Sequence, residues 1–177
     1  MVIIKWAKNG LFNDMRSRMR AYKNAEGLFT AIYIGSILIA ISLIFFYHGS
    51  ILIGLTNFFG SLTLAQVPGT GVYLPAPLTP AAHTDLYTAA FQFCLSLGIL
   101  EIIILGLRFL FNSPIKRKAE TIENIIFWLG ASYLIIAYLN DAATINTWFV
   151  FWAGLIMIFG LSLIARAFVL LVKRKST

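Results

Sequence analysis

Residues 87–111 form an apolar run long enough to cross a membrane, and this run carries one carboxylate, Glu101, near its middle. About 20 residues at a rise of 1.5 Å per residue cover the hydrocarbon core of a bilayer, so the run predicts a transmembrane helix. A charge near the midplane of a bilayer costs at least about 2.5 kcal/mol. We therefore expect Glu101 to face the protein interior or water, and not lipid.

The composition extends this prediction to the whole chain. Hydrophobic residues make up 59% of the 177 residues and charged residues only 12%, whereas soluble domains average about 25% charged residues. We predict an all-α fold, an integral membrane four-helix bundle that forms a single membrane domain over residues 1–177. The expected membrane spans are residues 27–48, 87–112, 120–139 and 147–172.

The basic residues give the chain a net charge of +7 and lie in three clusters, within residues 5–23, 108–118 and 166–175. Such clusters between long apolar stretches are typical of the positive-inside rule, and they predict a multi-pass protein with cytoplasmic N and C termini. The same clusters would attract anionic lipid at the cytoplasmic face of the bilayer. Because the charge follows the ends of the spans, we expect no nucleic-acid partner.

Residues 1–26 are predicted to form a basic amphipathic helix at the cytoplasmic membrane interface. Apolar residues recur in this segment at helical spacing (Leu11, Phe12, Met15, Met19 and Tyr22), and basic residues occupy the other side. A helix of this kind lies in the plane of the lipid headgroups.

Residues 49–86 are predicted to lie outside the membrane as a segment that does not span it. If the apolar part, residues 50–67, crossed the bilayer, the basic cluster at 116–118 would lie on the opposite side from the N-terminal cluster. Three placements of residues 50–67 stay open: an extension of the first span, an interfacial helix or a re-entrant helix. Residues 68–80 are rich in Pro and Gly, which predicts an irregular outer loop.

On the second span, residues at helical spacing form one stripe (Tyr87, Ala90, Cys94, Gly98, Glu101, Leu105 and Arg108). Gln92 and Ser96 lie on the opposite face, where they could form interhelical hydrogen bonds. Cys94 is the only cysteine, so the chain has no internal disulfide.

Four charged residues are expected in the inner half of the bundle, two of each sign: Glu101, Arg108, Glu123 and Arg166. They allow two interpretations. They could form an ion-pair network that fixes the register of the helices, or they could line a cation or proton pathway that uses Glu101.

The outer half carries two carboxylates, Asp85 and Asp141, and has no Lys or Arg. An acidic mouth of this kind concentrates cations. His83 and Asp85 are residue types that bind zinc, but the chain has no HExxH motif and no cysteine pair, so we expect no metal site. The sequence shows no catalytic signature, and we expect neither an enzyme nor a cofactor.

The sequence therefore predicts a small multi-pass membrane protein and leaves two functions open. One is an oligomeric cation or proton channel or transporter that uses the intramembrane carboxylate of Glu101. The other is a non-catalytic accessory or assembly subunit of a larger membrane complex. The expected partners are the lipid bilayer and either copies of the same chain or other membrane subunits.

Overall fold

A computed structural model describes residues 27–174 of the chain. The amphipathic helix predicted for residues 1–26 lies outside the described residues. The chain divides into two units, Met1–Ile37 and Leu38–Thr177. In the first unit, residues 27–37 are helical.

Within the described residues 27–174, four helices are long and apolar enough to cross a membrane: Gly27–Tyr47, Pro80–Leu110, Ile115–Tyr138 and Ile145–Val172. They overlap the four spans expected from the sequence. Length and composition support a multi-pass membrane protein, while the orientation of the termini stays a prediction.

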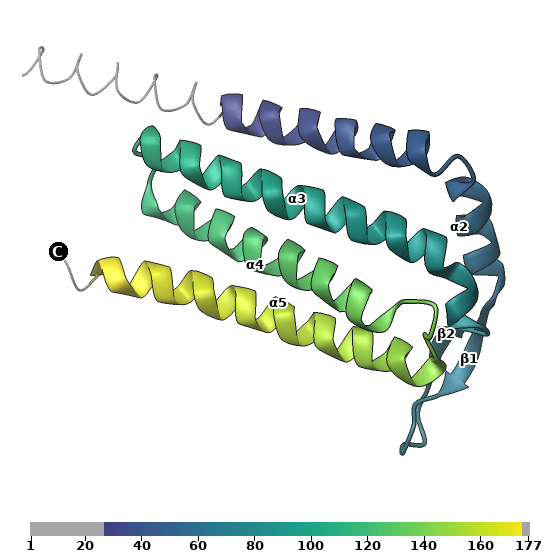
Figure 1. The fold of residues 1–177 in the computed structure, drawn as a ribbon. Helices are drawn as coiled ribbons and strands as arrows, with labels where there is room; N and C mark the ends of the chain where they lie inside the picture. Colours follow the sequence, from purple (N-terminus) through teal and green to yellow (C-terminus); the bar gives the residue numbers. More distant parts are fainter. Residues whose placement is uncertain (1–26, 175–177) are drawn as a thin grey trace, which may run out of the picture. The chain divides into compact units, whose positions relative to one another are not determined.

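Three long helices form the main body of the second unit: α3 (Thr84–Leu110), α4 (Ile115–Tyr138) and α5 (Ile145–Arg174). The middle helix, α4, packs against both of the others and runs antiparallel to them (Figure 1). It begins five residues earlier than residue 120, the start expected from hydropathy, because Pro114 directly precedes its first turn. The fixed φ of proline suits the start of a helix, whatever the polarity of the residues that follow.

Glycines allow the three helices to approach closely. A β-carbon added at Gly98 of α3 would lie 2.4 Å from Cδ2 of Leu129 on α4. One added at Gly130 of α4 would lie 2.6 Å from Cγ2 of Ile158 on α5. Small residues bring membrane helices into van der Waals contact in this way.

Residues 49–86 correct the all-α prediction. They hold α2 (Ile51–Gly60), the strands β1 (Leu62–Gln66) and β2 (Tyr73–Pro77), and the short 3-10 helix η1 (Pro80–His83). At 10 residues, α2 is too short to span a bilayer, in agreement with a non-spanning segment. The prediction of an irregular loop over residues 68–80 is wrong, because β2 pairs with β1 in an antiparallel hairpin.

The hairpin tolerates prolines because of its register. Backbone hydrogen bonds join Leu78 to Ser61 and Val67 to Val72, and the strands pair Leu64 with Pro75. In an antiparallel ladder, hydrogen-bonded pairs alternate with non-bonded pairs. Counting from the bonded pairs Ser61–Leu78 and Val67–Val72, the pair Leu64–Pro75 is a non-bonded one. Pro75 lacks an N–H, but at this position no ladder hydrogen bond is lost. The turn places Pro68 before Gly69, whose φ of +74° is the positive value that a type II turn requires.

The hairpin packs against the ends of the helices through aromatic side chains. Trp148 of α5 is buried, and its indole Nε1 donates a hydrogen bond to the carbonyl oxygen of Pro75 at 3.2 Å. Phe58 of α2 and Tyr87 of α3 contact the same indole, with ring centroids 5.8 and 6.4 Å away. This end of the unit comprises α2, the hairpin, the start of α3 and the α4–α5 turn (residues 139–144) (Figure 1). We call it the hairpin end.

Candidate functional site

Glu101 lies in the interface between α3 and α4, as the midplane position of its charge predicts. Its side chain is only 4% exposed. The amide Nδ2 of Asn124, on α4, donates a hydrogen bond to Oε1 of Glu101 at 2.7 Å. Within residues 27–172, no cationic group lies in ion-pair contact with this carboxyl group.

Arg108 lies two turns further along α3 and contacts the first turns of α4. Its Nη1 donates hydrogen bonds to Oγ1 of Thr121 at 2.6 Å and to the backbone carbonyl of Arg117. Thr121 is 1% exposed, so one end of the guanidinium lies within the helix interface. Neither Glu101 nor Glu123 is a hydrogen-bond partner of Arg108.

Arg166 connects α5 to α4. Its Nη1 donates to Oε2 of Glu123 at 2.9 Å, and its Nη2 lies 3.5 Å from Oε1 of Glu120. Of the four charges expected in the inner half, Arg166 and Glu123 therefore form an ion pair, Glu101 accepts a hydrogen bond from Asn124, and Arg108 donates to Thr121.

Two of these partners, Asn124 and Thr121, were not singled out from the sequence, and Glu120 was not expected to pair with Arg166. A signal for them exists in the spacing of polar residues on α4. Thr121 and Asn124 are three residues apart and face α3, while Glu120 and Glu123 are three residues apart and face α5. Residues at this spacing share one face of a helix.

The predicted stripe on α3 is only partly buried. Tyr87, Gly98 and Glu101 are buried, but Ala90 is exposed. On the opposite face, Gln92 forms the expected contact outside its own helix, because its Oε1 lies 3.2 Å from Nε2 of His48.

The α3–α4 interface is closed on the hairpin side of Glu101. Gly98, one turn from Glu101, packs directly against Leu129. Asp85 lies about 24 Å from Glu101 along the helix, at 1.5 Å per residue. An open path for an ion along this face therefore requires α3 and α4 to move apart at Gly98.

Both outer carboxylates, Asp85 and Asp141, are exposed at the hairpin end, one in the first turn of α3 and the other in the α4–α5 turn. His83, next to Asp85 in the chain, has its Nε2 at 2.8 Å from Oγ of Ser61. Among residues 27–172, no three His, Cys, Asp or Glu side chains are grouped so that they could hold a metal ion.

Comparison with known proteins returned no match: no protein-family model, curated protein or solved structure is similar to this chain. The function must therefore be argued from the geometry of the site itself.

Proposed function

We propose that the protein is a small membrane transport protein in which Glu101 binds a proton or a cation between α3 and α4. The observation that supports this proposal is the hydrogen bond from the neutral amide of Asn124 to a carboxyl group that is 4% exposed. An ionised carboxylate buried without a counter-ion costs many kcal/mol. A carboxyl group in this environment is stabilised by taking up a proton or a cation, which is the usual role of intramembrane acids in transporters.

The arrangement of the two arginines supports the same function. A guanidinium aimed at the site would repel a cation, but Arg166 binds Glu123 and Glu120 instead. The Nη1 of Arg108 is engaged by Thr121 and by the carbonyl of Arg117. Of Glu101, Glu120 and Glu123, it is Glu101 that forms no ion pair among residues 27–172 and therefore stays available to an incoming positive charge.

The proposed entrance is the hairpin end, where Asp85 and Asp141 are exposed. The chain has no Lys or Arg between Lys23 and Arg108. Negative potential at a mouth raises the local concentration of cations and lowers that of anions. Because Gly98 and Leu129 close the interface, we propose that the cation reaches Glu101 only when α3 and α4 separate, in an oligomer of this chain or in a complex with other membrane subunits.

An accessory or assembly subunit is the second candidate function, and one observation favours it. The same polar contacts interlock three helices, since Glu101 and Arg108 join α3 to α4 while Arg166 joins α4 to α5. Such bonds fix the register of neighbouring helices. In this alternative Glu101 is a structural residue and transports nothing.

Flux measurements on the purified chain in liposomes distinguish the two functions. We expect proton or cation flux in the wild type and flux at the background level in Glu101→Gln, since glutamine preserves the hydrogen bond to Asn124 but cannot ionise. Glu120→Gln is the matched control, because Glu120 is a partly exposed carboxylate of the same bundle outside the proposed site. Equal flux in wild type and Glu101→Gln, or anion flux above cation flux, would favour the accessory subunit.

A further inference from the structure

Two cavities share His48 as a lining residue, at the hairpin end of the second unit. The first has a volume of about 330 Å³ and lies between α2 and the start of α3. The second has a volume of about 510 Å³ and lies between residues 40–48 and the middle of α3. His48 lines both, and its Nε2 lies 3.2 Å from Oε1 of Gln92, which lines the second. Each cavity is of the size that binds small ligands.

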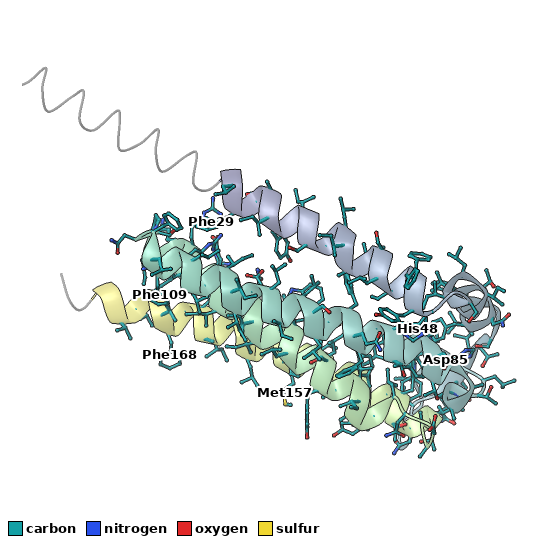
Figure 2. All side chains as sticks on the ribbon, turned by 45° about the horizontal axis from the view of Figure 1, so that its top comes forward. Phe29, His48, Asp85, Phe109, Met157 and Phe168 are labelled. Atoms are coloured by element: carbon teal, nitrogen blue, oxygen red, sulfur yellow. The ribbon has the colours of Figure 1, made fainter. Side chains whose placement is uncertain are left out.

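The first cavity has a larger polar share than the second and is lined by one carboxylate. Its polar side chains include Asn57, His83 and Asp85, and no Lys or Arg lines it. Within residues 27–172, the Asp85 carboxylate and the Asn57 amide form no hydrogen bond to another residue, so both are available to a ligand. Figure 2 shows His48 and Asp85 at the same end of the molecule, away from Phe109 and Phe168.

The second cavity is mainly apolar. Ala40, Leu43 and Ile44 line it on one side, and Gln92 and Ser96 on the other. Both walls belong to helices that are long and apolar enough to span a membrane. This cavity therefore suits a hydrocarbon chain, whereas the first suits a polar head.

From this juxtaposition we propose that the two cavities together bind one lipid with a primary ammonium headgroup. The ammonium binds the Asp85 carboxylate with help from Asn57, and one acyl chain follows the apolar cavity from His48 towards Ser96. An anionic headgroup would be repelled by Asp85. A quaternary ammonium has no N–H to donate, and the first cavity has no Phe, Tyr or Trp to bind it through a ring face.

The test is binding of defined lipids to the delipidated full chain in detergent, followed by native mass spectrometry and by thermal unfolding. Phosphatidylethanolamine should bind and raise the melting temperature more than phosphatidylcholine or phosphatidylglycerol with the same acyl chains. Asp85→Asn should weaken phosphatidylethanolamine binding about tenfold, the effect of one charge-assisted hydrogen bond. Asp141→Asn is the matched control, because Asp141 is exposed at the same end but does not line either cavity.

A second pair of variants tests the acyl-chain part of the site. Ser96→Leu fills the apolar cavity on a span face where leucine is tolerated, and it should weaken binding of phosphatidylethanolamine. Thr88→Leu, on the same helix but outside both cavities, should leave the binding unchanged. Equal binding of the three lipids, equal effects of the two aspartate variants, or stabilisation by soluble ethanolamine as strong as by the lipid would overturn the proposal.

Discussion

Gly98 is the residue at which the packing of α3 against α4 can be tested most directly. A β-carbon at this position would lie 2.4 Å from Cδ2 and 2.8 Å from Cγ of Leu129, so Leu129 has to move. We expect Gly98→Ala to lower the free energy of unfolding by about 1–3 kcal/mol, as overpacked cores do. The measurement is unfolding of the purified protein in mixed micelles.

Gly106→Ala is the control for this prediction, because Gly106 is on the same helix and a β-carbon there meets nothing within 4 Å. Both changes reduce the backbone freedom of the unfolded chain equally, which alone would stabilise the helix by up to about 1 kcal/mol. A Gly98→Ala variant as stable as Gly106→Ala would show that α3 and α4 are not in close contact at Gly98.

The partner of Glu101 gives a second prediction at the residue scale. Asn124→Leu removes the amide that donates to Glu101 at 2.7 Å and leaves a buried carboxyl group without a partner. Interhelical hydrogen bonds in membrane proteins contribute about 0.6–1.7 kcal/mol, so we expect a loss of stability of at least this size. The double variant Glu101→Leu/Asn124→Leu should recover part of the loss, because both polar groups are then absent. No recovery in thermal unfolding of the double variant would contradict the contact.

At the scale of elements, the hairpin depends on its contact with α5. The indole of Trp148 donates to the carbonyl of Pro75 and packs against Phe58. Trp148→Phe keeps an aromatic ring but removes the donor, so we expect a loss of about 1 kcal/mol and faster hydrogen exchange of the β1–β2 ladder. The exchange of individual backbone amides in residues 62–77 measures this effect.

Trp152→Phe is the matched control for the hairpin. Trp152 is one turn from Trp148 and 46% exposed, and its indole nitrogen forms no hydrogen bond among residues 27–172. This variant should leave the exchange of the hairpin amides unchanged. Equally faster hydrogen exchange in both variants would mean that the size of the aromatic ring, and not the hydrogen bond to Pro75, stabilises the hairpin.

At the scale of the whole molecule, the three basic clusters predict that both termini lie on the cytoplasmic side. Single cysteines at Thr70 and Ser176, in a chain whose Cys94 is replaced, test this orientation with a membrane-impermeant thiol reagent. Thr70 lies in the hairpin turn and is exposed, so we expect labelling from outside there and only after permeabilisation at Ser176. Labelling of Ser176 in intact cells would reverse the predicted topology.

The sequence by itself determined where the four long helices lie, because the free energy of transfer into lipid adds up residue by residue over about 20 neighbours. It also determined that Glu101 has to be shielded from lipid, since that cost depends only on the position of the charge in the span. The basic cluster at residues 116–118 likewise argued against another span in residues 50–67, because a crossing there would place this cluster on the opposite side from the N-terminal cluster.

Only the tertiary structure decided which group each polar side chain meets. In another rotation of α3 against α4, Glu101 would meet a different side chain of α4, and the close contact of Gly98 with Leu129 selects the rotation that offers Asn124. The hairpin could not be predicted from the sequence for a similar reason, because Pro75 locally argues against a strand. It is tolerated because the register of β1 places it at a non-bonded position, and that register involves residues 11 positions away in the chain.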